Sequence, residues 1–264
     1  MRTFLLAAVA GFAAHQVAGH ATWQELWVDG VDKISVQFHR IFHTPANVSH
    51  GSTCARLPLS NNPVTDVTSN DIACNAGTSP AAAKCSVNAG SVVTIEMHQQ
   101  PNDRSCANEA IGGAHYGPVQ VYMAKVTDAS TAVGASSGWF KVFADTWANT
   151  GSSGSDDAWG TKDLNTCCGK MDVKIPTDIA PVLTCYQITV TGSGTASPAT
   201  VKLPGAYAAS NPGILINIYQ TMTTYAAPGP TVYSGGSTKS AGAACAACES
   251  TCTAAAKRAV ETAL

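Results

Sequence analysis

His20 becomes the first residue of the mature chain if an N-terminal leader is removed. Arg2 precedes an apolar run from Phe4 to Ala14, and small residues from Val17 to Gly19 stand directly before His20. This layout is typical of a secretory signal peptide, predicted here as residues 1–19. A first-position histidine offers its free α-amino group and an imidazole nitrogen, which together can chelate a transition metal. Alternatively, His20 only marks where the leader ends.

His115 is the second candidate for chemistry. It lies in a glycine-rich segment in which Gly112 and Gly113 let the backbone turn sharply. Gly117-Pro118 then ends the loop where a strand is expected to begin. Taken by itself, a histidine at such a junction is often only a surface or capping residue.

The ten cysteines all follow Gly19, and an even number in an exported chain indicates disulfides. Their connectivity is not determined by one sequence. From Ser234 onward the chain is rich in small residues and contains Cys245, Cys248 and Cys252. A zinc knuckle there lacks a histidine or a fourth nearby cysteine. We therefore expect residues 234–264 to form a disulfide-tied or frayed helical tail.

Composition excludes several functions. Charged residues make up 12% of the chain and the net charge is −2, so no basic field recruits nucleic acid. No segment reaches the roughly 20 apolar residues of a membrane span. We expect a secreted, extracellular monomer without a membrane partner. Asn47 lies in the one glycosylation sequon.

Period-two alternation predicts the elements that must position these residues. It is clearest from Lys170 to Ile175 and from Tyr186 to Thr191, and weaker from Val93 to Met97. Val119–Val126 and Ile214–Tyr219 are also predicted strands. Short strands separated by Gly, Pro, Asn and Ser predict an all-β antiparallel sandwich of immunoglobulin or fibronectin type over residues 20–233. Residues 102–115 and 144–166 are expected to form loops at its ends, where function usually resides.

Four blocks of the sequence together resemble a known family, and they occur in that family's order. The family is that of fungal lytic polysaccharide monooxygenases, auxiliary activity family 9, and the resemblance covers most of residues 20–33 and 51–236. The blocks are His20, Met97-His98-Gln99-Gln100-Pro101 to Ala114-His115-Tyr116-Gly117-Pro118-Val119, Gly138-Trp139-Phe140-Lys141, and Pro212-Gly213-Ile214-Leu215 to Tyr225-Ala226-Ala227-Pro228-Gly229-Pro230.

The resemblance implies a copper site in which the amino group and imidazole of His20 and the imidazole of His115 bind one ion. Three nitrogens in a plane suit tetragonal copper. The implied reaction uses an external electron donor and O2 or H2O2, abstracts hydrogen beside a glycosidic bond, and cleaves cellulose or a related β-1,4-glucan. Tyr225 matches a tyrosine that stacks on the glucan, although it can equally close a proline-rich turn. A disulfide between Cys74 and Cys185 is also implied.

The chain departs from the family in one strand and its loop. On the order of two dozen residues, about one strand plus its loop, are absent after Pro181. Val182 stands where the family has its axial copper tyrosine, and a histidine and a glutamine near the metal have no counterpart. Tyr186 lies four residues farther along, too far to replace the tyrosine. Without a tyrosine at this point, we expect an open axial position. Residues that orient metal ligands typically change affinity or activity 10–100-fold, so we also expect reduced activity.

A second departure is an insertion over residues 34–50. Its three histidines, His39, His43 and His50, could form a second metal site, but nothing fixes them together. A flexible loop or a translated intron remnant is the alternative.

Three function classes follow from these observations. The first is a copper-dependent cellulose monooxygenase, and the second is a copper- and polysaccharide-binding protein with little or no turnover. The third is a glycoside hydrolase, which needs two carboxyl groups about 5–10 Å apart across a sugar. Asp156 and Asp157 lie in a Gly/Ser-rich loop, and this does not indicate such a pair.

Overall fold

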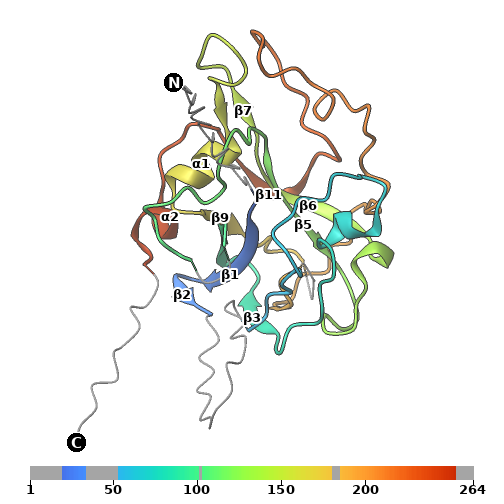
Figure 1. Cartoon of the computed structure of the whole chain (residues 1–264). Coiled ribbons are helices and arrows are strands. Elements are labelled where there is room, and N and C mark those ends of the chain that lie inside the picture. Colours follow the sequence, from blue (N-terminus) through green and yellow to red (C-terminus); the bar gives the residue numbers. More distant parts are fainter. Residues whose placement is uncertain (1–19, 34–52, 101–102, 180–184, 254–264) are drawn as a thin grey trace, which may run out of the picture.

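The computed structural model describes residues 20–33, 53–100, 103–179 and 185–253 (Figure 1). The predicted leader, the insertion with its three histidines and Asn47, and Val182 lie outside these ranges. The described elements are β1 (Thr22–Val28), β2 (Val31–Asp32), η1 (Asn70–Ala73), β3 (Cys85–Asn88), β4 (Val92–His98), β5 (Val119–Ala124), η2 (Gly134–Ser136), β6 (Trp139–Asp145), β7 (Trp147–Ala148), β8 (Ala158–Trp159), α1 (Gly160–Thr166), β9 (Lys170–Lys174), β10 (Ile188–Thr191), β11 (Val232–Lys239) and α2 (Ala247–Thr251).

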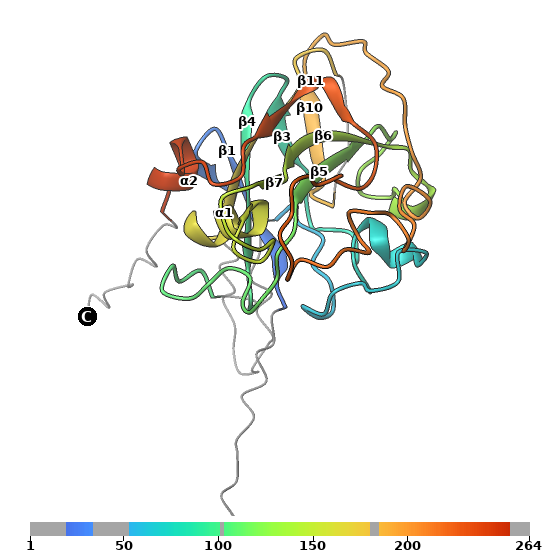
Figure 2. The same ribbon diagram turned by 90° about the horizontal axis from the view of Figure 1, so that it is seen from above.

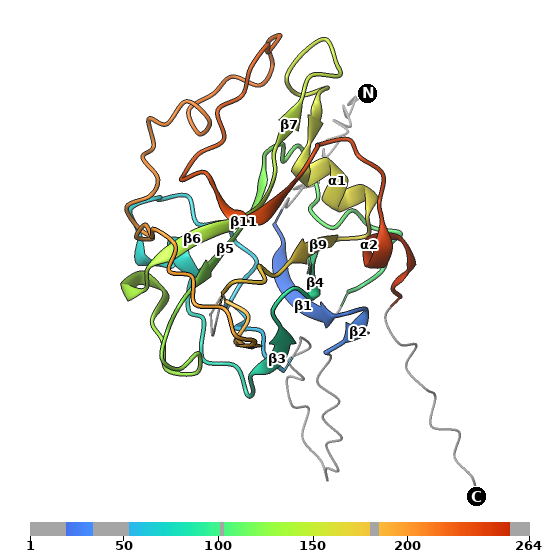
Figure 3. The same cartoon turned by 180° about the vertical axis from the view of Figure 1, so that it is seen from behind.

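Two sheets form a sandwich, as expected from the alternation. One sheet has the strand order β2-β1-β4-β9, and the other has the order β11-β6-β5. Figures 1 and 3 show β5 and β6 on one side of the molecule and β1, β4 and β9 on the other, and Figure 2 gives the view from above. The first sheet is antiparallel throughout, whereas β11 joins β6 in parallel and β10 pairs with β3 in parallel. The sandwich is therefore mainly, but not wholly, antiparallel.

The inner faces of the sheets carry the apolar side chains that the alternation predicts. In β9, Met171 and Val173 are completely buried. In the neighbouring strand β4 of the same sheet, Ile95 is in register with Met171 and is also buried. The opposite face of β9 is polar, with Lys170 buried, Asp172 half-buried and Lys174 exposed. α2 packs against β9, and the backbone N–H of Cys248 donates to Asp172.

The predicted strand from Ile214 to Tyr219 is wrong. The segment forms turns, in which the N–H groups of Ile214 and Leu215 both donate to the carbonyl of Asn211. Leu215 and Tyr219 are more than 70% exposed. Alternation produces a strand only where a sheet supplies a partner, and this segment has none among the described strands.

Five disulfides join all ten cysteines: Cys54–Cys85, Cys74–Cys185, Cys106–Cys168, Cys167–Cys245 and Cys248–Cys252. The second of these is the pair that the resemblance implied. Because Cys245, Cys248 and Cys252 are all oxidised, they form no zinc knuckle.

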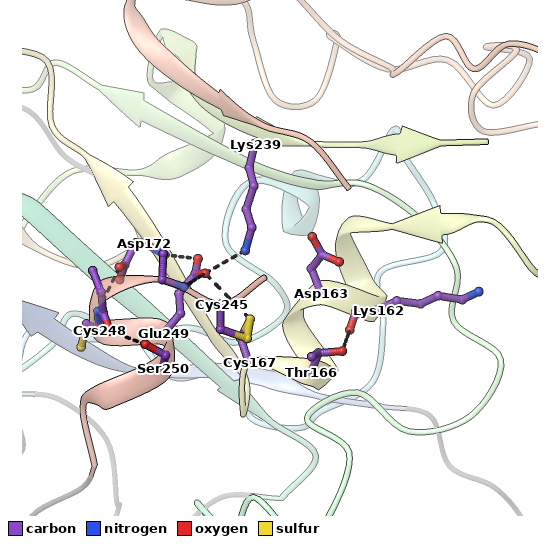
Figure 4. Close-up of a disulfide and its surroundings, with 12 residues drawn as sticks. Lys162, Asp163, Thr166, Cys167, Asp172, Lys239, Cys245, Cys248, Glu249 and Ser250 are labelled. Atoms are coloured by element: carbon purple, nitrogen blue, oxygen red, sulfur yellow. Dashed lines mark hydrogen bonds and ion pairs between the residues drawn. A yellow bond between two sulfur atoms is a disulfide. The ribbon is translucent and has the colours of Figure 1, made fainter. Parts of the chain in front are cut away.

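The C-terminal segment is tied to the sandwich up to residue 253, where the description ends. β11 runs across residues 233 and 234, where we expected the tail to begin. Figure 4 shows Cys245 bonded to Cys167 at the end of α1, with Glu249 of α2 reaching Lys239 and the N–H of Asp172. The tail is therefore fixed by a disulfide, an ion pair and backbone hydrogen bonds.

The space between the two sheets is not completely filled. A cavity of about 560 Å³ lies there, lined mainly by apolar side chains of β1, β4, β5 and β9. Tyr186, just before β10, and Gln120 of β5 contribute polar atoms to its wall.

Candidate functional site

His20 lies directly before β1 and is partly buried. The first residue of β1, Thr22, is in register with His98, the last residue of β4. His98 is buried, and its Nε2 lies 2.8 Å from Glu96. The start of β1 therefore rests on a strand whose end is fixed by a buried hydrogen bond, which limits where His20 can lie.

His115 is carried by a loop that α1 holds in place. Its N–H donates to Gly113, whose φ of +77° belongs to the left-handed region that glycine adopts without strain. Gly117 exchanges two hydrogen bonds with Thr161, one to its hydroxyl and one from its N–H, both 3.1 Å long. These contacts leave the His115 side chain exposed at the end of β5.

Chain neighbours of both histidines border the cavity between the sheets. Ala21, next to His20, and Pro118, three residues after His115, line the same cavity. One side chain is partly buried and the other exposed, so both can meet a small ion at the surface. Imidazole and amine nitrogens suit copper, and the amine exists only if cleavage makes His20 the first residue. The donor set therefore fits the metal that the resemblance implies.

Among the residues that the structure describes, no group of three or more His, Cys, Asp or Glu side chains is placed to hold a metal ion. A site made of two imidazoles and one amino group needs only two such side chains. The observation therefore argues against a closed structural zinc site in the described chain and leaves the copper site a prediction.

The charges beneath β1 form a fully paired cluster around Glu96. Arg104 donates from its Nε and another guanidinium nitrogen to Glu96, and from Nη1 to Asp32 at 2.7 Å. Trp27 adds an indole N–H at 2.7 Å. Burial alone raises the pKa of Glu96, but hydrogen bonds from His98, Arg104 and Trp27 lower it to about 2. Glu96 is therefore ionised at physiological pH, and its contact with Trp27 joins β1 to β4 through side chains as well as backbone.

A second buried carboxyl group, Asp145, lies at the end of β6 opposite the start of β5. It is completely buried beside Asp163, whose carboxylate accepts the N–H of Gly242. Burial and the neighbouring Asp163 raise the pKa of Asp145 to about 7, although Lys239 acts in the opposite direction. Asp145 therefore holds a proton at a higher pH than an ordinary aspartate does.

Tyr225, expected to contact substrate, has intramolecular partners. Its hydroxyl donates to Gly213 at 3.0 Å, and its ring meets that of Trp159 edge-to-face with centroids 4.9 Å apart. Burial raises its pKa to about 12. These contacts are those of a tyrosine that closes a turn, and its role toward substrate stays a prediction.

Sequence reasoning did not single out Tyr219 as a binding residue, because it placed Tyr219 in a strand. Its segment joins the loop between β7 and β8, with the N–H of Ser155 donating to Ile218 and that of Gly154 to Gln220. Lys162 of α1 donates to Ser155 and lies over the ring of Tyr116, next to His115. The segment with Tyr219 therefore contacts the loop between β7 and β8, and Lys162 connects that loop to Tyr116, the neighbour of His115. Aromatic exposure is a tertiary property, and no local signal in the sequence marks it.

Tyr186 is a core residue. It is 8% exposed, forms an isolated bridge with Ala55, and lines the cavity. Burial and the charges of Glu25 and Glu96 raise its pKa well above the usual value. The hydroxyl thus lies toward the carboxylate cluster of β1 and β4.

Asp156 and Asp157 act within their own loop. Asp157 is buried and accepts the indole N–H of Trp147 and the backbone N–H groups of Thr150 and Gly151, each at 2.9 Å. Asp156 accepts hydroxyl hydrogens from two serines. Both carboxylates are used to shape the loop, as the polar-loop interpretation suggested.

Comparisons with known proteins give one consistent answer. The model of Auxiliary Activity family 9 (formerly GH61) matches residues 20–182 and 183–226. The AA9 family lytic polysaccharide monooxygenase B of Thermothielavioides terrestris is 58% identical over 96% of this chain and 80% of its own length. Monooxygenase E of Neurospora crassa is 56% identical over 95% of this chain and 78% of its own length. A solved structure, HiLPMO9B, is 29% identical and superposes with a TM-score of 0.63 over 81% of this chain and 99% of that one.

The comparisons also bear on the expected gap. The family match is broken between Val182 and Leu183. The match to the Thermothielavioides protein extends over 278 positions, whereas 96% of 264 residues is about 253, so about 25 aligned positions have no residue in this chain. This agrees with the two dozen residues that the sequence comparison predicted to be absent.

Proposed function

Because the chain belongs to Auxiliary Activity family 9, whose sandwich fold it shares, we propose that it is a copper-dependent lytic polysaccharide monooxygenase acting on cellulose or a related β-1,4-glucan. The observation that supports the proposal is that Ala21, next to His20, and Pro118, three residues after His115, line the same cavity. Copper, when bound, supplies the one-electron and oxygen chemistry that hydrogen abstraction at a glycosidic carbon requires. The chain's own residues hold the ion and present the substrate.

Within this proposal, His20 contributes its amino group and imidazole, and His115 contributes its imidazole. The amino group must lose its proton to bind, from a free pKa near 7.7–8.0, so affinity rises with pH over this range. The contacts of Thr161 with Gly117 restrict the His115 loop before the metal arrives. Such restriction lowers the entropy lost on binding.

We propose that the exposed side chains of Leu215 and Tyr219 contact the glucan, together with Tyr225 if its turn opens. An aromatic ring presents a flat apolar face to a sugar ring, and exposed apolar groups commonly mark a binding surface. Secretion follows from the predicted leader of residues 1–19. No helix among the described residues is long and apolar enough to cross a membrane.

A second candidate function is copper- and polysaccharide-binding with little or no turnover. The break in the family match between Val182 and Leu183 supports it, because Val182 stands where the resemblance places the axial tyrosine. The two candidates predict the same ligands and differ only in product formation.

The metal part of the proposal is tested on the secreted, mature protein. Intact mass and N-terminal sequencing should place the first residue at His20. Titration with Cu(II) should give one tight site, which His115→Ala weakens and His43→Ala leaves unchanged. A first residue other than His20, or equal affinity in His115→Ala, contradicts the site. Loss of binding in His43→Ala assigns the metal to the insertion instead.

The activity part is tested by product analysis on cellulose. Reductant should release oxidised oligosaccharides, and a copper chelator should abolish them. At equal copper loading the yield should fall well below that of the Thermothielavioides relative. Equal yields contradict the expected impairment, and copper binding without any oxidised product supports the second function. Comparing cellulose binding by Tyr219→Ala and Tyr225→Ala separates the exposed tyrosine from the one that closes a turn.

A further inference from the structure

Strands β4 and β5 line the cavity between the sheets with different sets of residues. From β4 it is lined by Val93, Ile95 and Met97, which are alternate residues on one face of the strand. From β5 it is lined by every residue of Pro118–Met123 in succession. Side chains alternate between the two faces of a strand, so a consecutive run of lining residues belongs to the strand's edge. The cavity therefore extends along the edge of β5.

This edge of β5 carries backbone groups that a neighbouring strand can pair with. β5 is the last strand of the sheet β11-β6-β5, and its register with β6 uses its other edge. A strand edge is a template for pairing with another extended chain. In the part of the chain that the structure describes, Oε1 of Gln120 is also buried in the cavity wall without a hydrogen-bond partner.

Among the described residues, no strand pairs with this edge of β5. The family match is broken between Val182 and Leu183, and about 25 positions of the Thermothielavioides relative have no residue here. β5 has six residues, and a strand of that length plus a loop fits well within about 25 positions. An apolar cavity beside an open strand edge is the structure expected where one strand of a sandwich is absent.

We propose that the cavity and the edge of β5 form a groove that binds an extended peptide with alternating apolar side chains, supplied by a separate polypeptide. Backbone hydrogen bonds to β5 provide one part of the affinity, and burial of alternate side chains between the sheets provides the other. This activity goes beyond the proposed oxidation of glucan, and it requires neither copper nor substrate.

A separate peptide fits the groove better than a second copy of the chain. The exposed apolar segment Ile214–Tyr219 has its backbone engaged at both ends. The N–H groups of Ile214 and Leu215 donate to Asn211, and the carbonyl of Ile218 accepts from Ser155. Inserting this segment into another molecule breaks these bonds first. A compact apolar molecule as the occupant would make no backbone hydrogen bonds to β5, so it would use only one of the two features of the groove.

The probe is a synthetic peptide with the residues of the Thermothielavioides relative that lie between its matches to Val182 and Leu183. It is titrated into the full mature chain without copper, with a scrambled peptide of the same composition as the control. We expect saturable one-to-one binding, a raised melting temperature, and slower hydrogen exchange of residues 119–124. The scrambled peptide should bind about tenfold or more weakly, which corresponds to about 1.4 kcal/mol.

A variant pair locates the groove. Val121→Trp fills the cavity beside β5 and should weaken peptide binding about tenfold or more, again near 1.4 kcal/mol. Val31→Trp makes the same substitution at a position of β2 that is 58% exposed, and it should leave binding unchanged. Circular dichroism confirms that both variants fold, and hydrogen exchange of the unaltered chain provides the test if Val121→Trp does not.

Several outcomes overturn the proposal. These are no binding by the folded chain, equal binding of the scrambled peptide, binding without protection of residues 119–124, and self-association that protects β5 while excluding the peptide. Because the assay contains no copper, its failure leaves the proposed monooxygenase function untouched. Failure of the copper titration likewise leaves the groove untouched.

Discussion

Glu96 and Asp145 are equally buried, with 1% and 0% of their surfaces exposed, yet their pKa values move in opposite directions. The pKa of Glu96 is lowered to about 2, and that of Asp145 is raised to about 7. Burial disfavours the charged form of both groups. The difference arises because Glu96 is surrounded by donors, whereas Asp145 lies beside another carboxyl group. The neighbours of a buried carboxyl, more than its depth, therefore decide its protonation.

The elements that surround each carboxyl group explain why the two pKa values differ. Donors reach Glu96 from β1, from the end of β4 and from the loop that follows, through Trp27, His98 and Arg104. Asp145 meets α1 and the C-terminal segment, where Lys239 forms an ion pair with Glu249 at 2.7 Å. The nearby cation is thus already engaged by Glu249, and it offsets only part of the rise in the pKa of Asp145.

The largest expected effect comes from removing the cation of the paired cluster. Arg104→Met leaves Glu96 and Asp32 buried without their main donor, and we expect a loss of about 3–5 kcal/mol in the free energy of unfolding. Urea denaturation measures it. Lys84→Met, which breaks the exposed ion pair with Asp128, is the matched control and should change stability far less. Similar losses in the two variants contradict the importance of burial.

Asp145 should control the pH dependence of stability near neutrality. Its folded pKa of about 7 exceeds the ordinary value of 3.8, so the folded state binds the proton more tightly. Its contribution is complete below the unfolded pKa and is lost as pH rises through about 7, at up to about 1.4 kcal/mol per pH unit. Asp145→Asn should flatten this slope between pH 5 and 8.

Glu96 and Asp128 have lowered pKa values and therefore titrate at acid pH, unlike Asp145. Glu96 has a lowered folded pKa, so its stabilisation is present above its ordinary pKa of 4.5 and is lost as pH falls toward about 2. Asp128→Asn, at an exposed carboxyl group, is the control for Asp145→Asn and should leave the slope from pH 5 to 8 unchanged. A neutral-pH slope that persists in Asp145→Asn shows that another group is responsible.

A smaller effect is expected from Glu249→Gln. The substitution keeps the side-chain shape but removes the charge that pairs with Lys239, and we expect a loss of roughly 1–2 kcal/mol. Freed Lys239 and the missing negative charge should also lower the pKa of Asp145. Hydrogen exchange of α2 and the pH slope report these two results separately. Ser250→Ala, on the same helix, is the control. An unchanged slope in Glu249→Gln means that the two carboxyl groups are not coupled.

Much of the sandwich was predictable because it rests on local alternation. Met171 and Val173 repeat every second residue and lie on the buried face of β9, and the same holds for Ile188 and Val190 in β10. Ile214–Tyr219 is also rich in apolar, strand-favouring residues but forms turns, because pairing depends on a partner strand distant in sequence. A periodic pattern states which face is apolar, not whether a sheet is present to receive it.

The candidate site was predictable only in part. A leader boundary and a glycine-rich turn, both local signals, made His20 and His115 candidates, and only the resemblance implied their role as copper ligands, which stays a prediction. The Glu96–Arg104 contact, the protonation of Asp145 and the exposure of Tyr219 depend on which loops meet in space. The number of cysteines predicted disulfides, whereas the Cys167–Cys245 bond that fixes the tail had no signal in the sequence.

The cavity between the sheets also has a volumetric consequence. Hydrostatic pressure favours states of smaller volume, and internal space within a fold is eliminated when the chain unfolds. A cavity of about 560 Å³ therefore makes this sandwich easier to unfold by compression than a relative whose sheets are fully packed. Pressure resistance thus measures how completely the sandwich is filled, without reference to metal, substrate or heat.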